Sequence, residues 1–280
     1  MARLPVQKTL KMYVGGKFIR SESGRTTPAR GADGSVMNVN YASRKDLRGS
    51  IENNRSAQPG WAALTAYNRG QILYRLAEIL EDRLGTLPTT QSDAEAATDR
   101  AVHHAGWADK VSAILSTLNP VAATYVNYSL VRPLGVVLAI PAPGDGLLGM
   151  VEALCASALM GNATTLLVTP ASAELATHLA EALATSDFPG GVVNVLTGDL
   201  DDVLKTANVH DDLDALYVTE GVLSKGTLTQ AQTEGAQVMR RIILTKGAAR
   251  PASPAELARL SETQTVWMSA WEPSGGAAAY

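Results

Sequence analysis

Hydrophobic and polar positions repeat along this chain in two different ways, and each predicts a different kind of element. From Arg69 to Arg83, apolar residues recur every three or four positions and charged residues take the opposite face, which predicts an amphipathic helix. Gly135 to Ile140 is instead continuously apolar, as expected of a strand buried on both faces of a parallel sheet. Similar apolar runs alternate with helical segments as far as Thr245. The pattern predicts an α/β fold with a doubly wound parallel sheet and flanking helices.

The strands predicted for this sheet are 135–140, 164–168, 192–196, 213–218 and 239–245, and the helices between them are 147–160, 172–184, 200–207 and 221–237. Upstream, a Gly-Gly turn within Met12 to Ile19 predicts a small hairpin. Ser43 with Asp46 forms a capping-box pattern that predicts a helix through the mid-50s. Ser92 to Leu118 predicts a further long helix, or two in line.

Two other segments alternate between polar and apolar residues, which predicts half-solvated strands. The first spans Val126 to Leu130, and the second spans Thr265 to Trp271. The second would place Trp267 and Trp271 on one face. These tryptophans could cover the edge of the hydrophobic core or anchor an interface with another chain. The sequence leaves both interpretations open. A Gly/Ala/Pro linker over 246–253 and a short helix precede this last strand.

The composition narrows the class of protein. In 280 residues, 24 lysines and arginines stand against 27 acidic residues, which argues against a dedicated nucleic-acid binder. The length predicts one large domain or two small ones. The single Cys155 excludes a disulfide framework and a four-cysteine zinc site, and it fits a reducing cytoplasm. The start has no apolar signal segment, and prolines and charges interrupt the most apolar stretch, Val131 to Met160, so we expect no signal peptide or spanning helix.

Four sequence blocks, in this order, resemble the aldehyde dehydrogenase superfamily. They are HHAGWADK at His103 to Lys110, VRPLGVVLAI at Val131 to Ile140, LMGNATTLLVTP at Leu159 to Pro170 and FPGGVVNVLTG at Phe188 to Gly198. The resemblance runs from about Met12 to Gly247. It implies a Rossmann-like NAD(P)-binding domain over residues 1–248 that includes a β oligomerisation arm at about 120–132. Residues 249–280 would add the linker, a short helix and the C-terminal strand.

The chain departs from the superfamily at positions that carry its chemistry. The asparagine that helps to hold the oxyanion corresponds to Gly144, which has no side-chain donor, and such a contact is often worth about 3 kcal/mol. The general-base segment corresponds to Leu244 to Gly247, which contains no acid. The nucleophilic cysteine of the superfamily lies further downstream, in a second α/β domain that we expect to be absent here. The resemblance therefore implies no catalytic residue in this chain.

Positions that contact the cofactor in the superfamily differ as well. The lysine that contacts the adenosine ribose corresponds to Thr169, and the glutamate after it corresponds to Ser172. In the turn that approaches the nicotinamide-side phosphates, a glycine is replaced by Thr219 and a serine by Glu220, whose charge would repel a pyrophosphate. A truncated and degenerate copy of this kind resembles the noncatalytic C-terminal half of family-16-type aldehyde dehydrogenases.

These departures lead to one leading hypothesis. The protein would be a noncatalytic assembly or regulatory subunit that uses the segments 125–131 and 265–271 to form a homodimer or to hold an active aldehyde dehydrogenase chain. We expect no metal, no resident cofactor, no nucleic-acid or membrane partner, and a cytoplasmic location. One alternative is an NAD(P)-binding oxidoreductase subunit that oxidises aldehydes only with a partner catalytic chain. Another is a sensor that binds NAD(P) or a nucleotide at the carboxyl ends of the strands.

The residues themselves offer few candidates for cofactor binding. Gly144, Gly146 and Gly149 match G-x-G-x-x-G between a strand and a helix, which is the context of a dinucleotide fingerprint. The strand that ends near Val168 is followed by no acid to hold a ribose, so these glycines equally fit a turn that replaces a lost catalytic loop. The remaining candidates are Thr169, Ser172 and Gly198.

Other reactive side chains favour structural roles. Cys155 lies mid-helix among apolar neighbours, so we expect an inert core residue rather than a nucleophile. His103 and His104 point about 100° apart on a helix, so they cannot share a metal ion by the usual spacing and are expected on the surface or in helix packing. His178 and His210 have no evident partners. The aspartates between 201 and 214 lack the spacing of a calcium loop and predict a solvated face.

Overall fold

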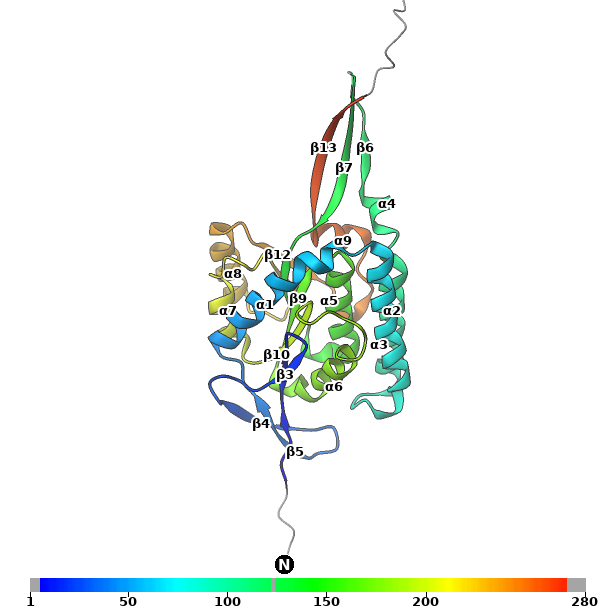
Figure 1. The fold of residues 1–280 in the computed structure, drawn as a ribbon. Helices are drawn as coiled ribbons and strands as arrows, with labels where there is room; N and C mark the ends of the chain where they lie inside the picture. The colour runs from blue at the N-terminus through cyan, green and yellow to red at the C-terminus, as the bar shows by residue number, and fades with distance from the viewer. Residues whose placement is uncertain (1–5, 122–123, 271–280) are drawn as a thin grey trace, which may run out of the picture.

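A seven-stranded sheet lies at the centre of the computed structural model, which describes residues 6–121 and 124–270 (Figure 1). The strand order is β12-β11-β8-β9-β10-β2-β3. The parallel strands are β8 (Val136–Ile140), β9 (Ala163–Val168), β10 (Val193–Thr197), β11 (Ala215–Thr219) and β12 (Arg241–Thr245). The antiparallel hairpin of β2 (Met12–Val14) and β3 (Lys17–Ile19) extends the sheet beside β10. The predicted parallel sheet and hairpin are confirmed.

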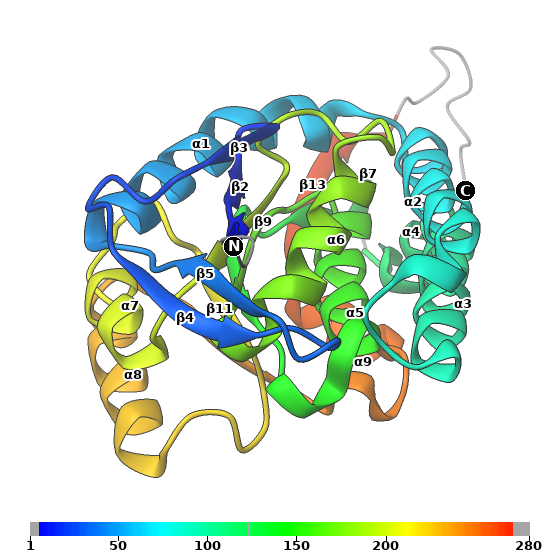
Figure 2. The same cartoon turned by 90° about the horizontal axis from the view of Figure 1, so that it is seen from below.

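Helices cover both faces of this sheet, so every residue of β8, β9, β10 and β11 is buried (Figure 2). On one face lie α5 (Gly146–Leu159) and α6 (Ala173–Leu183), with α2 (Ala66–Asp82) and α3 (Gln91–Trp107) packed against α5. On the other lie α1 (Arg44–Ala63), α7 (Leu200–Ala207) and α8 (Lys225–Gln237). Because side chains alternate along a strand, Val137 belongs to the first core and Leu138 to the second. No helix within the described residues is long and apolar enough to cross a membrane.

Some helix ends differ from the predicted ones for local reasons. The capping box of Ser43 and Asp46 is formed, but α1 continues to Ala63 because Trp61 is buried and donates its indole N–H to the Ala158 carbonyl at 2.8 Å. The α8 helix begins at Lys225 rather than near residue 221. The Ser224 hydroxyl caps this helix because it accepts a hydrogen bond from the backbone amide of residue 227. The predicted helix over 92–118 is two helices, α3 and the short α4 (Val111–Leu115).

A small sheet near the N-terminus was not predicted. It has the order β1-β5-β4, formed by β1 (Thr9–Leu10), β5 (Val36–Asn40) and β4 (Thr26–Arg30). Leu10, Met37 and Val39 form a separate small core with Ala173 of α6. These strands are short and mostly polar, so their sequence lacks the apolar run that marked the central strands.

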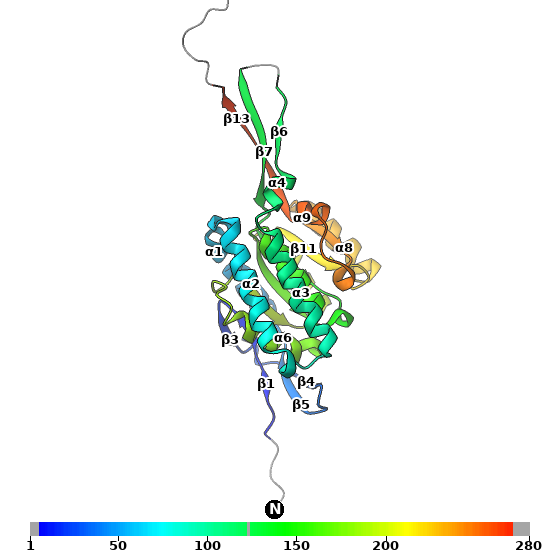
Figure 3. The same cartoon turned by 90° about the vertical axis from the view of Figure 1, so that its right-hand side faces the viewer.

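A three-stranded antiparallel arm projects from the domain (Figures 1 and 3). Its order is β13-β7-β6, formed by β13 (Ser261–Ser269), β7 (Tyr125–Pro133) and β6 (Thr117–Asn119). The short helix α9 (Pro254–Arg259) leads into β13, which therefore begins four residues before the predicted start at Thr265. The strands β13 and β7 pair along their whole lengths, from Ser261 opposite Pro133 to Ser269 opposite Tyr125. Trp271, predicted on the same face as Trp267, lies outside the described residues.

Candidate functional site

The parallel strands end together at one edge of the sheet, which we call the carboxyl edge. Proteins with doubly wound sheets bind ligands at this edge, beside the point where the strand order reverses. Here the order reverses at β8, since β9 lies on one side of it and β11 on the other. The sequence candidates Gly144, Gly146, Gly149, Thr169, Ser172 and Gly198 all lie in or beside the connections that follow β8, β9 and β10. The fold thus gathers them at one edge, and their surroundings decide what they can bind.

The glycine turn between β8 and α5 is occupied by a carboxylate from α3. Asp93 accepts the Leu147 amide at 2.9 Å and the Leu148 amide at 3.3 Å. Gly146 has a φ of 58°, and a Cβ atom there would lie 2.7 Å from an Asp93 carboxylate oxygen, so the turn requires glycine. In a dinucleotide site the positive N-terminus of such a helix faces a phosphate. In this chain an internal acid already takes that position.

Asp145 fills the space beside the next glycine. A Cβ atom on Gly149 would lie 2.3 Å from the Asp145 Cβ, whereas the same position on Gly144 is open. The Asp145 carboxylate also accepts the Ala248 amide at 3.2 Å. It thereby joins the turn to residues 246–253, which we call the closing segment. The predicted fingerprint glycines form a turn that is packed with the protein's own side chains.

A buried ionic cluster lies under the closing segment. Glu152 of α5 accepts a hydrogen bond from Arg100 at 2.6 Å, and His104 Nε2 lies 2.9 Å from the same carboxylate oxygen. The other Glu152 oxygen accepts the Ala252 amide at 3.0 Å, and Arg100 donates to the Ala248 carbonyl at 3.2 Å. The cluster therefore connects α3, α5 and the closing segment.

The charge state of Glu152 follows from these partners. Burial alone would raise the pKa of its carboxyl, but the hydrogen bond and charge of His104, followed by those of Arg100, outweigh burial and lower this pKa. His104 is fully buried in helix packing, one of the two settings expected for it. Sequence reasoning missed the cluster, although an acid within the apolar GLLGMVEALCASALMG segment is a signal of a buried partner.

Cys155 has no access to a substrate. Its side chain is fully buried in the core between the sheet and the helices, as predicted. Burial, and then the nearby Glu152 carboxylate, raise the pKa of the thiol well above its usual value. A nucleophilic cysteine needs the opposite environment, because the thiolate is the reactive form.

The turn after β11 is also filled. Glu220 is exposed and forms an ion pair with Lys246 at 2.5 Å, so the repulsion expected from its charge is partly offset. Thr219 packs beside Gly247, where an added Cβ would lie 2.8 Å from the Thr219 methyl. The buried Tyr217 hydroxyl donates to the Thr245 hydroxyl at 3.2 Å. This part of the carboxyl edge is held together by its own side chains.

An open pocket of about 460 Å³ remains at the carboxyl edge, beyond β9, β10 and β11. We call it the carboxyl-edge pocket; its lining consists of Tyr41, Thr169, Pro170, Gly198, Asp199, Leu200, Asp201, Val222, Leu223 and Ser224. Two predicted candidates, Thr169 and Gly198, thus line it, and the described residues supply no hydrogen-bond partner to the buried Thr169 hydroxyl oxygen. Ser172 lies outside the lining, at the start of α6.

The remaining candidates have structural partners. The Nδ1 atom of His210 accepts the amide of residue 212 at 3.2 Å, and His178 lies 3.8 Å from Glu181. Asp202 forms an exposed ion pair with Lys205, as expected of a solvated face. The expectation is wrong for Asp214, which is half-buried because its carboxylate pairs with Arg55 at 2.7 Å and accepts the Val136 amide at 2.7 Å. Within the described residues, no group of three histidine, cysteine or acidic side chains is arranged to hold a metal ion.

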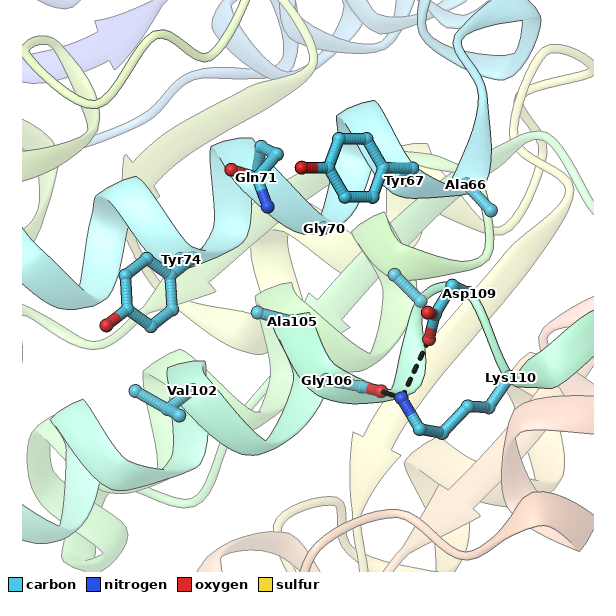
Figure 4. Close-up of a pocket in the computed structure, with 11 residues that line it drawn as sticks. Ala66, Tyr67, Gly70, Gln71, Tyr74, Val102, Ala105, Gly106, Asp109 and Lys110 are labelled. Carbon is cyan, nitrogen blue, oxygen red and sulfur yellow. Dashed lines mark hydrogen bonds and ion pairs between the residues drawn. The ribbon is translucent and has the colours of Figure 1, made fainter.

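A second concavity lies on the outer surface, between α2 and α3 (Figure 4). It measures about 300 Å³ and has the exposed rings of Tyr67 and Tyr74 on one wall and Val102 on the other. Lys110 closes one end, where its ammonium donates to the Gly106 carbonyl and to Asp109. The groove lies away from the carboxyl edge and its lysine is bonded to Gly106 and Asp109, so we do not consider it a catalytic site.

Known proteins of one family share the sequence pattern and the fold of this chain. The model of the aldehyde dehydrogenase family matches residues 21–269, so the match includes β13 and extends past the limit at Gly247 that the sequence blocks had indicated. The aldehyde dehydrogenase candidate DhaS of Bacillus subtilis (strain 168) is 29% identical over 265 residues, which cover 88% of this chain and 52% of DhaS.

Solved structures show the same fold. A mutant form of an aldehyde dehydrogenase from Bacillus cereus superposes with a TM-score of 0.77 at 23% identity, over 85% of this chain and 50% of that one. PnpE from Pseudomonas sp. WBC-3 gives a TM-score of 0.76 at 24% identity, with the same two coverages. This chain therefore spans about half the length of the relatives that it matches. Because the family model matches most of its residues, the chain belongs to the aldehyde dehydrogenase family.

Proposed function

We propose that this protein is a noncatalytic member of the family that serves as an assembly or regulatory subunit. The observation that supports this proposal is the arm β13-β7-β6, a single layer of sheet that stands out from the domain (Figure 3). Several of its apolar side chains are exposed to solvent. A three-stranded sheet gains stability when it buries an apolar face. The arm is therefore suited to hold another chain.

The register of the arm places five apolar residues on one face. Val126 lies opposite Met268, and Tyr128 lies opposite both Val266 and Leu118. Leu118 is 76% exposed, Met268 52% and Val126 40%. We call this face, formed by Leu118, Val126, Tyr128, Val266 and Met268, the arm face. Contiguous apolar surface of this kind marks interaction sites.

The partner that we propose is a second copy of this chain or an active aldehyde dehydrogenase chain. Among the described residues, the outer edges of β13 and β6 pair with no other strand, so backbone N–H and C=O groups are free to extend the sheet into a partner. Trp267 is 61% exposed on the opposite face and packs edge-on against Tyr125, with ring centroids 6.3 Å apart. Its exposure favours the interface interpretation over the core-cover interpretation.

The noncatalytic part of the proposal rests on the carboxyl edge. Oxidation of an aldehyde through a covalent cysteine adduct needs an accessible thiolate and a base. Cys155 is buried and protonated, and no acid replaces the missing base in Leu244 to Gly247. The residues also do not fit the diphosphate of a dinucleotide, since Asp93 and Asp145 occupy the turn where it would approach.

An oligomer assay tests the assembly role. We expect the wild-type protein to be a dimer or larger by light scattering, or to co-purify with an aldehyde dehydrogenase expressed beside it. Met268→Asp places a charge on the arm face and should abolish either association. Val36→Asp, an exposed apolar position on β5 away from the arm, is the matched control and should leave it intact. A wild-type protein that is monomeric and captures no dehydrogenase would contradict the proposal.

A turnover assay tests the noncatalytic role. Purified protein with NAD or NADP and a panel of aliphatic and aromatic aldehydes should show no reduction of the cofactor. Robust turnover that is lost in Cys155→Ala would refute this part of the proposal, whatever the oligomeric state.

The alternative function is that of an NAD(P)-binding oxidoreductase subunit which is active only with a partner catalytic chain. The open carboxyl-edge pocket favours it, and a related structure is an NAD+ complex of an aldehyde dehydrogenase from Bacillus cereus. Calorimetric titration with NAD, followed by assays of each chain alone and together, tests it. Dissociation constants below about 1 mM and activity that requires both chains would favour it over the leading proposal.

A further inference from the structure

The carboxyl-edge pocket has the size and walls of a small-molecule site. Its volume of about 460 Å³ falls within the range of about 300–1,000 Å³ that is typical of ligand pockets. Connections after three successive strands form it, at the edge where doubly wound sheets bind ligands. Leu200, Val222, Leu223 and Pro170 give it apolar walls, and the ring of Tyr41 adds an aromatic one.

All the charged residues that line the pocket are negative. Asp199 and Asp201 are its only charged residues, and neither forms an ion pair with any residue that the structure describes. Neighbouring acids differ, because Asp202 pairs with Lys205 and Glu220 with Lys246. The lining therefore has a net negative charge, and no described cation forms an ion pair with it.

Both carboxylates keep free acceptor capacity. Asp199 accepts the Asp202 amide at 3.0 Å as the N-cap of α7, and Asp201 accepts the Thr227 hydroxyl at 3.3 Å. An ionised carboxylate has about four lone-pair sites, so most of them remain open to a donor. The Thr169 hydroxyl adds a buried polar group to which the described residues supply no partner.

The phenol of Tyr41 lies close to the same negative charges. Its pKa is raised, first by burial and then by the charges of Asp199 and Asp202. The Arg25 guanidinium stacks on the same ring at 4.8 Å, but it lines a neighbouring depression with Ser43 and Lys45 rather than this pocket.

We propose that the carboxyl-edge pocket binds a small organic cation, namely a protonated amine attached to an apolar body. The ammonium would bind Asp199 and Asp201, and the apolar body would pack on Leu200, Val222 and Leu223. A phosphate-bearing ligand would meet two uncompensated carboxylates instead. This site goes beyond the assembly role and does not depend on it, since the arm lies at the far end of the domain (Figure 1).

Three probes of similar shape and different charge test the proposal by calorimetry at pH 7 and low salt. We expect 2-phenylethylammonium to bind, the neutral 2-phenylethanol to bind at least about fivefold more weakly, and the anion 3-phenylpropionate to give no heat. NAD and AMP, added separately, should bind more weakly than the amine. The absence of amine binding, or equal or tighter binding of 3-phenylpropionate, AMP or NAD, would overturn the proposal.

Substitutions locate the site. Asp199→Asn should weaken amine binding about fivefold while the α7 helix stays capped, because asparagine caps as well as aspartate. Asp201→Asn should act in the same direction. Glu95→Gln changes the net charge equally at an exposed position on α3 and should leave binding unchanged. Amine binding that is insensitive to both aspartate substitutions would refute the assignment, and thermal melts would show that each variant is folded.

Discussion

At the scale of single residues, three acids determine what the carboxyl edge can do. Asp93 caps α5, Asp145 fills the space beside Gly149, and Glu152 binds Arg100 and His104 beneath the closing segment. Each acid bonds to groups of its own chain. The glycine turn and the closing segment are therefore held together by these acids, whereas the carboxyl-edge pocket stays open.

The Glu152 cluster predicts a pH-dependent stability. Removal of one partner from a buried pair costs about 3–5 kcal/mol, so Glu152→Gln should lower the free energy of unfolding at pH 7 by a large part of that amount. The carboxyl has a lower pKa in the folded chain than its ordinary value of 4.5. Its stabilisation is therefore present above pH 4.5 and is lost as the pH falls through the lowered value.

Urea unfolding at several pH values measures this effect. The difference in stability between wild type and Glu152→Gln should shrink as the pH falls below about 4.5. Arg75→Gln, which breaks an exposed ion pair with Glu78, is the control and should change stability by less than about 1 kcal/mol. A difference that stays constant down to the lowest pH at which the protein folds would contradict the lowered pKa.

The packed glycine turn predicts a second effect. Gly149→Ala places a methyl group 2.3 Å from the Asp145 Cβ, so we expect a loss of about 1–3 kcal/mol through overpacking. Gly144→Ala meets no atom within 4 Å and is the matched control, with an expected change within about 0.5 kcal/mol. Thermal or urea melts measure both. Equal stabilities of the two variants would show that Asp145 does not fill this space.

At the scale of elements, α9 fixes the end of the closing segment. Ser253 and Glu256 form a capping box, in which the Ser253 hydroxyl accepts the Glu256 amide and the Glu256 carboxylate accepts the Ser253 amide. Arg250 pairs with the same glutamate at 2.5 Å. Since β13 follows α9 directly, this cap also sets where the arm strand begins.

We expect Ser253→Ala to destabilise the protein by about 1 kcal/mol, because the first turn of α9 loses its N-cap. Thr229→Ala, at an exposed interior position of α8, should change stability by less than about 0.5 kcal/mol. Hydrogen exchange followed by mass spectrometry should show faster exchange in α9 and the start of β13 in Ser253→Ala. Unchanged exchange there would mean that the cap does not hold the segment.

At the scale of the whole molecule, a closed domain carries an open arm. The domain buries its sheet between two helical layers, whereas the arm exposes Leu118, Val126 and Met268 with no second layer in the described chain (Figures 1 and 2). This contrast explains why we place the function in association rather than in chemistry.

Arm-mediated self-association predicts a melting temperature that depends on concentration. A partner at about 100 times its dissociation constant adds about 2.7 kcal/mol, which raises Tm by about 5 °C or more for a domain of this size. Differential scanning calorimetry across a hundredfold range of protein concentration should show this rise in the wild type and not in Met268→Asp. A wild-type Tm that is independent of concentration would leave only the hetero-partner form of the proposal.

The sequence by itself determined the elements whose signals are local. The apolar runs at 135–140 and 164–168 predicted central strands, and the Ser43 pattern predicted a helix start that the structure confirms. The alternation in Thr265 to Trp271 predicted the opposite faces of Trp267 and Met268. The polar strands β4 and β5 carried no such signal, because their few apolar residues pack only in a small separate core.

Only the tertiary structure decided what the predicted site residues contact. Asp93 reaches the α5 turn from 54 positions earlier in the chain, and Asp145 reaches Ala248 from 103 positions away. Hydrophobic periodicity reports which face of an element is buried, but it does not say which distant polar side chain fills a particular space. The glycines of the turn were therefore visible in the sequence, whereas the carboxylates that occupy it became visible only when the chain was folded.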